Sequence, residues 1–230
     1  MININWPIEK EKLRKMPIGE PFICMFSGGK DSGLALSMTI NKGKPIALVH
    51  YIDENSKESI FHKQKCEIIE AQATALNLPV VYQYNKWWVK WNKIVKMYME
   101  YKKQGVKYVV FGDLVSEDNA KTQVTLCQSA GLIPCMPLWL LPYEILLDEI
   151  KERNIKSIIT IINDPLIESK WLGKVFDRQA YECFKELGID PFGENGEFHT
   201  TLVDADCFKS PLNYKIIAND SKKIVITVKA

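Results

Sequence analysis

Short apolar runs recur through the first half of the chain, and a longer amphipathic segment separates each from the next. The runs are rich in β-branched and aromatic residues: PFICMF (21–26), PIALVHYI (45–52), LPVVYQY (78–84) and KYVVFGD (107–113). Continuously apolar strands are typical of parallel sheets that helices cover on both faces. Helical patterns fill the intervals, at about 32–41, 58–77 and 88–104. This order predicts βαβ units with right-handed crossovers, and therefore an α/β fold.

The pattern changes after about residue 130. The segment GLIPCMPLWLLP (131–142) carries three prolines and separates the alternating part from a different arrangement. We expect a helix near 142–153, a strand at 157–164, a helix near 174–187, and antiparallel strands at the end with a turn at 219–221. The sequence thus predicts a nucleotide-binding α/β domain over residues 1–130 and a smaller mixed α/β domain over residues 131–230.

Charge and cysteine usage narrow the class of protein. The net charge of +2, without a basic block, gives no support for a nucleic-acid partner. The first residues lack the apolar core of a secretory signal, and no run approaches the ~20 apolar residues of a membrane span. The six cysteines form no C-x-x-C pair, and the three histidines are far apart, which argues against structural zinc. We therefore expect a cytoplasmic protein with reduced thiols and no membrane contact.

The segment SGGKDS (27–32) lies where the first predicted strand ends and the first helix begins. At such a turn, unpaired helix amides face a ligand, glycines allow close approach and serine hydroxyls add donors. It fits neither the Walker A pattern nor the dinucleotide pattern G-x-G-x-x-G. Two readings follow from the residues: an ordinary capped turn, or a phosphate cradle formed by Ser27, Gly28, Gly29, Lys30, Asp31 and Ser32.

The pattern S-G-G-x-D-S resembles the PP-loop of the ATP pyrophosphatases, which hold the β- and γ-phosphates of ATP and cleave between the α- and β-phosphates. The resemblance implies that these six residues bind ATP. Mg²⁺ is inferred from the phosphate chemistry, with Asp31 as its ligand or merely as a first-turn acid. Asp113, at the end of the fourth predicted strand, either faces the nucleotide or caps a turn. His50 ends the second strand, where a core role is favoured over base recognition.

A second crowded segment, DPFGENGEFHT (190–200), precedes an alternating strand. Loops rooted in an ordered element often carry binding groups. Its candidate catalytic residues are Glu194, Asn195, Glu197 and His199, with purely structural roles left open for two of them. A histidine with a near-neutral pKa is suited to deprotonate ammonium or orient an acyl group.

Together the two motifs are similar to those of the diphthine–ammonia ligase family of ATP pyrophosphatases. Further family-like segments follow in order: FGD (111–113), GL-x-x-x-x-PLW (131–139), WLGK (171–174) and DADCFKSP (204–211). The resemblance covers nearly the whole chain. It implies an adenine nucleotide alpha hydrolase-like (HUP-type) domain, followed by a domain that contributes the acceptor site.

The chain also departs from that family. Ala120, Thr122 and Val124 stand in the helix where family members commonly have arginine and glutamate, and DADCF (204–208) replaces D-G-P-x-F. Several segments resemble the family's bacterial branch, where no diphthamide is expected. The acceptor is therefore left open between diphthine on elongation factor 2 and an unidentified small molecule.

The resemblance implies an ATP-dependent amide ligase that adenylates a carboxylate, releases pyrophosphate and uses free ammonium as its nitrogen source. The alternatives are an ATP-binding sensor or regulatory module, and a PP-loop enzyme that acts on another acceptor, on sulfur or on RNA. The absence of a C-x-x-C pair and of a basic run counts against sulfur and RNA chemistry. A homo-oligomer is left open.

Overall fold

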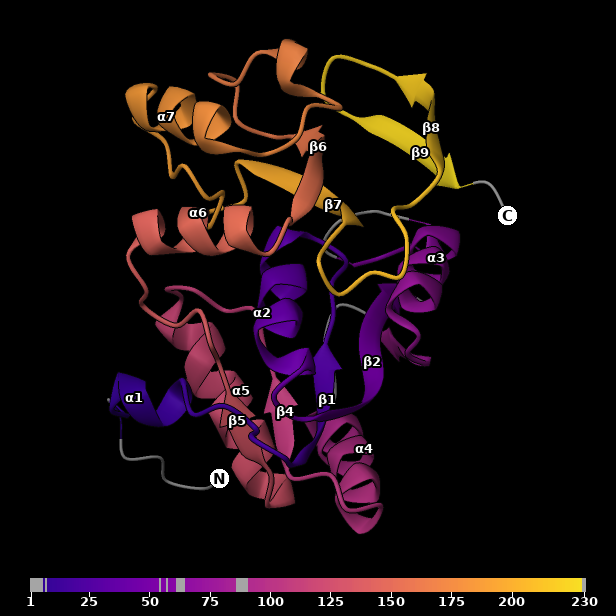
Figure 1. Ribbon diagram of the computed structural model, residues 1–230, viewed down its shortest axis with the longest axis vertical. Helices are drawn as coiled ribbons and strands as arrows, with labels where there is room; N and C mark the ends of the chain where they lie inside the picture. The colour runs from indigo at the N-terminus through magenta and orange to yellow at the C-terminus, as the bar shows by residue number, and fades with distance from the viewer. Residues whose placement is uncertain are drawn as a thin grey trace.

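The computed structural model describes residues 6, 8–53, 55–56, 58–60, 65–85 and 91–228. Its first unit is a five-stranded parallel sheet with the strand order β3-β2-β1-β4-β5 (Figure 1). The strands are β1 (Pro21–Met25), β2 (Lys44–Asp53), β3 (Val80–Asn85), β4 (Tyr108–Val110) and β5 (Ile133–Cys135). The strand order reverses between β1 and β4, and a crevice forms at such a point in an α/β sheet.

Helices cover both faces of this sheet. On one face, α2 (Lys30–Ile40) and α3 (Cys66–Leu76) pack on Phe22, Cys24 and Leu48. On the other face, α1 (Lys10–Leu13), α4 (Trp91–Lys103) and α5 (Glu117–Ala130) pack on Ile23 and Val49. Neighbouring residues of each strand thus point into opposite layers, which explains why the strands are apolar without alternation.

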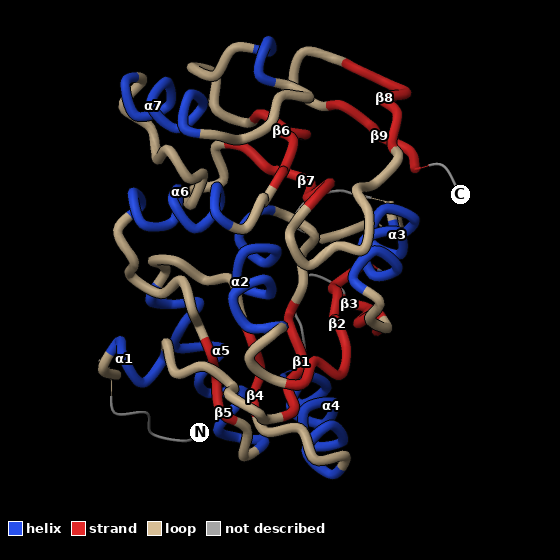
Figure 2. Tube along the Cα trace, viewed as in Figure 1, coloured by secondary structure: helices blue, strands red, loops and turns tan. Residues whose placement is uncertain are grey.

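The second unit lies above the carboxyl ends of β1 and β2 (Figure 1). In chain order its elements are α6 (Tyr143–Glu152), β6 (Lys156–Ile162), η1 (Ser169–Trp171), α7 (Arg178–Glu186), β7 (Phe198–Asp204), β8 (Tyr214–Asn219) and β9 (Ile224–Val228). β6 and β7 pair antiparallel, and β8 and β9 form a hairpin (Figure 2). None of the helices in the described part of the chain is long and apolar enough to cross a membrane.

The two units share one hydrophobic cluster. It joins Leu34 and Leu36 of α2 to Leu147 of α6, Phe184 of α7 and Leu202 of β7. These side chains are almost fully buried. Hydrophobic contact between the units is therefore continuous, and α2 is covered by the sheet on one side and by the second unit on the other.

The sequence predicts the fold class and most elements correctly: the four apolar runs are the parallel strands β1 to β4, and the terminal segments are antiparallel strands. Two helices begin later than predicted. α3 starts at Cys66, because Glu58 and Ser59 form β-bridges instead, and α7 starts at Arg178, because Asp177 caps it. Parts of the predicted helices, including His62 and Trp88, lie outside the described residues.

One strand was missed. The segment after residue 130, predicted as a separator, contains β5, which pairs with β4 through Tyr108, Val109 and Val110. A boundary at residue 130 would cut this strand from its sheet, so a division into units falls after Cys135. The division into two domains itself stays a prediction.

Candidate active site

A cavity of about 340 Å³ opens where the strand order reverses. It lies at the carboxyl ends of β1, β2 and β4, and it is within the ~300–1,000 Å³ of typical small-molecule sites. Its lining combines apolar side chains with polar groups from the SGGKDS loop (residues 27–32), the end of β4, α5 and the loop before β7. It therefore has the size and chemical mixture of a small-molecule site.

The SGGKDS loop is closed on itself by Ser32. The Ser32 hydroxyl donates to the Gly29 carbonyl at 3.3 Å, accepts from the Ser27 amide at 3.2 Å and lies 3.0 Å from the Ser27 hydroxyl. Gly28 has a φ of 85°, which favours glycine. The first intrahelical bond runs from the Gly33 amide to Gly29, so the amides of Asp31 and Ser32 precede it and are suited to an anion.

Gly112, in the FGD segment, lies against the start of α2. A Cβ atom at this position would be 2.7 Å from the Ser32 amide nitrogen and 2.8 Å from the Asp31 carbonyl carbon. Both are backbone atoms, which cannot move aside as a flexible side chain can. Glycine therefore permits the end of β4 to approach the SGGKDS loop, and it brings Asp113 to the cavity wall.

The SGGKDS loop is also fixed to β7. The Gly28 carbonyl accepts from the Leu202 amide at 2.8 Å and from the Gln72 side chain at 2.9 Å. The same Gln72 nitrogen donates to the Leu202 carbonyl at 2.7 Å, and the Lys30 amide donates to the Thr200 hydroxyl at 3.0 Å. The loop thus has hydrogen-bond partners on α3 and on the strand that follows the second motif.

Three partly buried carboxyl groups meet at the cavity. Burial, with repulsion from Asp31, raises the pKa of Glu194 to about 8, and burial raises the pKa of Asp113 to about 6. The pKa of Asp31 is also raised by burial, although the Lys30 ammonium 2.8 Å away opposes this. Carboxyl groups with shifted pKa values that lie in a cleft are typical of functional sites.

The loop that carries Glu194 is held by its own side chains. Glu197 accepts from the Asn195 amide at 3.0 Å, from the Asn195 side chain at 3.0 Å and from the Asp190 amide at 3.3 Å. Asp190 in turn accepts from the amides of Phe192 and Glu194, and from the Tyr143 hydroxyl at 2.8 Å. We call residues 193–197 the GENGE loop.

The structure brings together part of the predicted site. The cavity is lined by Ser27, Asp31, Ser32, Asp113, Glu194 and His199. Gly28 and Gly29 shape the turn beside it. Three further predicted residues do not line it either. Asn195 and Glu197 bond to each other, and the Lys30 ammonium points into a group of phenylalanine rings.

Sequence reasoning missed several lining residues. His50 is 1% exposed, and its Nδ1 donates to the Phe26 carbonyl at 2.7 Å, which leaves Nε2 as an acceptor without a partner among the described residues. Burial lowers the pKa of His50 and keeps the ring neutral. Its place near the carboxyl end of β2, already noted from the sequence, was the available signal.

On α5, the cavity is lined by Asn119 and Gln123, which share one helix face at a spacing of four residues. Ala120 and Val124, two of the residues that differ from those common in the family, have side chains that are fully buried in the core beneath this helix. These two substitutions therefore concern packing on the sheet, whereas the polar pair faces the cavity.

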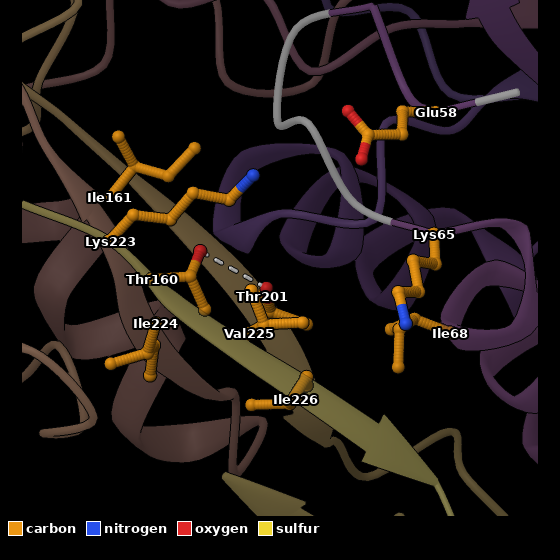
Figure 3. A pocket seen from close by; sticks show the side chains of 10 residues that line it. All are labelled: Glu58, Lys65, Ile68, Thr160, Ile161, Thr201, Lys223, Ile224, Val225 and Ile226. Carbon is orange, nitrogen blue, oxygen red and sulfur yellow. Dashed lines mark hydrogen bonds between the residues drawn. The ribbon is translucent and has the colours of Figure 1, made fainter. Parts of the chain in front are cut away.

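A second cavity, of about 70 Å³, lies among β6, β7, β9 and α3 (Figure 3). Thr160 and Thr201 point into it, joined by a hydrogen bond of 3.2 Å, while Lys65 and Lys223 lie at its sides (Figure 3). None of the predicted site residues lines it. It is too small for a nucleotide.

The carboxyl groups of the cavity bear on whether it could hold a metal ion. Among the residues that the structure describes, no three histidine, cysteine or acidic side chains are grouped as metal ligands. Asp31 and Asp113 nevertheless supply the hard oxygen atoms that Mg²⁺ prefers. A magnesium ion fits this site if the phosphates of a nucleotide provide its other ligands.

Comparison with known proteins gives matches along both units. Residues 21–134 match the diphthamide synthase N-terminal domain, and residues 142–226 match the diphthamide synthase C-terminal domain. The diphthine–ammonia ligase of Homo sapiens is 32% identical over 128 residues, which are 54% of this chain and 46% of that protein. The Mus musculus enzyme of the same name is 26% identical over 232 residues, covering 87% of this chain and 84% of that protein.

A crystal structure described as a predicted subunit of tRNA methyltransferase from Methanocaldococcus jannaschii is also similar. It is 17% identical, with a TM-score of 0.40, and the match covers 80% of this chain and 97% of that chain. This likeness is too weak to bear on function.

Proposed function

Because this chain belongs to the diphthamide synthase family, we propose that it is an ATP-dependent ligase that adenylates an acceptor carboxylate and amidates it with ammonia. ATP, ammonium and a carboxylate are its substrates, and AMP and pyrophosphate are released. The curated relatives that carry the name diphthine–ammonia ligase support this class of reaction.

One observation carries the proposal. The SGGKDS loop and the GENGE loop, which are far apart in sequence, contribute Ser27, Asp31 and Glu194 to one cavity at the reversal of the strand order. An adenylating ligase needs phosphate-binding groups and acceptor-binding groups within reach of the same α-phosphate. A cavity lined by both motifs meets that requirement.

In the first step, a carboxylate oxygen of the acceptor attacks the α-phosphorus of ATP. The bond from this phosphorus to the bridging oxygen breaks, and pyrophosphate leaves with the electron pair. The amides of Asp31 and Ser32, with the Ser27 hydroxyl, hold the departing phosphates. Positioning the two reactants accounts for most of what the protein does in this step.

In the second step, ammonia attacks the carbonyl carbon of the acyl-adenylate, and AMP leaves as the carbon–oxygen bond breaks. A proton must be removed from nitrogen. Glu194, whose pKa is raised to about 8, can accept it in its ionised form, which predominates above about pH 8. His199 lines the same cavity and orients the acyl group, while Asn195 and Glu197 hold the loop in shape.

Asp31 and Asp113 would hold a magnesium ion together with the phosphates. When bound, the ion neutralises charge on the leaving pyrophosphate. The raised pKa values of these carboxyls make cation binding more favourable at higher pH, because the ion displaces protons.

The acceptor is either diphthine on elongation factor 2 or a small molecule. The polar face of Asn119 and Gln123 on α5 lines the cavity, so it contacts whichever acceptor or nucleotide group enters there. Their amides both donate and accept, and they suit a polar acceptor of either kind.

The test is to incubate the purified chain with ATP, Mg²⁺ and ¹⁵N-ammonium, with and without diphthine-bearing elongation factor 2. AMP and pyrophosphate are quantified, and ¹⁵N in the factor is measured by mass spectrometry. The Glu194→Gln variant removes the proposed base, and Glu152→Gln, on the exposed side of α6, is the matched control.

AMP and ¹⁵N incorporation that both require the factor would support the diphthine acceptor. AMP formed equally without it would support a small-molecule acceptor. ATP binding without AMP under any condition would contradict the diphthine acceptor and favour a sensor. We expect Glu194→Gln to lower the amidation rate by about 10²-fold or more, and Glu152→Gln to leave it unchanged.

A further inference from the structure

Lys30 is the one charged group of the SGGKDS loop that the proposed reaction does not use. Its side chain is only 6% exposed, and its ammonium lies 2.8 Å from Asp31. Lys30 begins α2, yet the side chain reaches across to the second unit, where aromatic rings surround its end.

Three phenylalanine rings form this aromatic cage: Phe176, Phe192 and Phe198. The Lys30 nitrogen lies 5.5, 5.3 and 5.6 Å from their respective centroids. The rings also contact one another, with Phe176 stacked on Phe198 at 5.5 Å and Phe192 at 5.4 Å from Phe176. All three distances to the nitrogen are within the ~6 Å of a cation–π interaction.

The cage is built around the GENGE loop. Phe192 immediately precedes this loop and Phe198 immediately follows it, so both ends of the loop contact the same ammonium. Inside the loop, Gly193 has a φ of 77°, and a Cβ there would lie 3.0 Å from the Phe198 ring. The loop is therefore folded tightly against the cage, and Glu194 leaves this turn toward the cavity.

The Lys30 ammonium has two kinds of neighbour, the Asp31 carboxylate and the three phenylalanine rings. Asp31 lines the cavity, where the phosphates of ATP are proposed to bind, and two of the three rings, Phe192 and Phe198, flank the GENGE loop. A buried ammonium that loses its carboxylate partner must rely more on the rings, and a buried carboxylate that loses its ammonium is left uncompensated. The Lys30 ammonium is thus in contact both with a carboxylate of the cavity wall and with the two rings that flank the GENGE loop.

We propose that Lys30 is a positioning residue that couples ATP binding at the SGGKDS loop to the conformation of the GENGE loop. This inference rests on the proposed function, since it assumes that ATP binds beside Asp31. It differs from the expectation drawn from the sequence, in which the Lys30 ammonium contacts phosphate directly. To do so, the side chain would have to leave all three rings.

The experiment measures hydrogen–deuterium exchange of peptides that contain residues 192–198, with and without Mg²⁺–ATP, in the full chain. ATP affinity is measured on the same samples by calorimetry. Lys30→Met keeps the length and apolar contacts of the side chain but removes the charge. Lys185→Met is the matched control, because Lys185 also lies over a ring, that of Tyr181 at 5.5 Å, but is exposed on α7.

We expect ATP to slow exchange of the GENGE loop in the wild-type chain and in Lys185→Met. In Lys30→Met, ATP affinity should change by less than about tenfold, while the ATP-dependent slowing disappears. Lys30→Arg, which keeps the charge and stacks well on aromatic rings, should recover most of the slowing. A purely structural lysine would not produce this separation between affinity and loop response.

Several results would overturn the inference. One is that ATP still slows exchange of the GENGE loop in Lys30→Met. Another is that ATP slows this exchange equally in the Arg and Met variants. A third is that ATP does not slow exchange of the loop in the wild-type chain. A loss of ATP affinity far beyond tenfold in a folded Lys30→Met would also do so, because it would make Lys30 a phosphate ligand.

If Lys30→Met does not fold, Phe192→Leu tests the same coupling, because it removes one ring face and keeps an apolar side chain. Retention of the full ATP effect in that variant would contradict the inference, and its reduction would support it. A wild-type chain that binds no ATP would refute the proposed function itself. That result is distinct from ATP binding without a loop response, which refutes only the coupling.

Discussion

At the scale of single residues, the carboxyl groups of the cavity set how the ligand-free protein responds to pH. The pKa of Glu194 rises from its ordinary value of 4.5 to about 8 in the folded state. The folded state therefore holds this proton more tightly than the unfolded state, and stability falls as pH increases from about 4.5 to about 8. The pKa of Asp113, raised to about 6, also makes stability fall as pH increases, but over a lower range of pH.

We predict that Glu194→Gln reduces this loss of stability, because the amide does not ionise. Relative to the wild-type chain, the variant should unfold at a higher temperature at about pH 9 and at nearly the same temperature at about pH 5. Thermal unfolding followed by circular dichroism at both pH values is the measurement. An equal shift at both would show that packing, rather than ionisation of Glu194, causes the change.

Gly112 gives a second prediction at this scale. Gly112→Ala places a methyl group against the backbone of Asp31 and Ser32, so the end of β4 must move away from the SGGKDS loop. We expect a loss of about 1–3 kcal/mol in the free energy of unfolding and weaker ATP binding.

Gly33→Ala is the comparison for Gly112→Ala, because the nearest atoms to its methyl belong to a side chain, that of Leu202 at 2.8 Å, and not to backbone. Urea unfolding and calorimetric titration with ATP should show a smaller loss for Gly33→Ala. The same effect in both variants would contradict the explanation from backbone contact.

The sequence motifs identify which segments form the cavity but not the direction of each side chain. The composition of SGGKDS predicts a phosphate loop, whereas the position of the Lys30 ammonium depends on phenylalanines more than 140 residues away in the chain. Glu197 is similar: its bonds to Asn195 and Asp190 follow from the turn geometry of the loop. Motif spacing carries no information about either contact.

At the scale of elements, Gln72 connects α3 to both the SGGKDS loop and β7. We predict that Gln72→Leu lowers the free energy of unfolding by about 1–3 kcal/mol, because the buried Leu202 carbonyl loses the donor that Gln72 supplies. ATP affinity should fall as well, since the Gly28 carbonyl loses one of two donors. Urea unfolding with and without ATP measures both effects, and unchanged stability would contradict the connecting role.

Long apolar or amphipathic elements are readily predicted from the sequence, and short or bridged ones are not. β5 is three residues long and contains Pro134, so neither its length nor its composition is typical of a strand. The start of α3 is displaced because Glu58 pairs with Lys65 and Ser59 pairs with Ile52. Tertiary pairing overrides the helical periodicity in that segment.

At the scale of the whole molecule, the shared hydrophobic cluster joins the two units. Leu202, on β7, is fully buried and contacts α2. We predict that Leu202→Ala lowers the free energy of unfolding by about 2–5 kcal/mol and destabilises both units together. Native-state hydrogen exchange should show the same loss for amides of β1 and β6. A loss confined to β6 would mean that the units unfold independently.

The edge of the parallel sheet that β5 forms affects whether another copy of the chain can pair with it. The Ile133 amide donates to Lys107 and the Cys135 carbonyl accepts from Phe111, so the backbone of Pro134 between them faces outward. Proline has no N–H there, and an incoming strand finds no donor at the centre of this edge. Such an edge disfavours pairing with a strand of another copy, and it therefore lowers the tendency of the chain to aggregate by sheet extension.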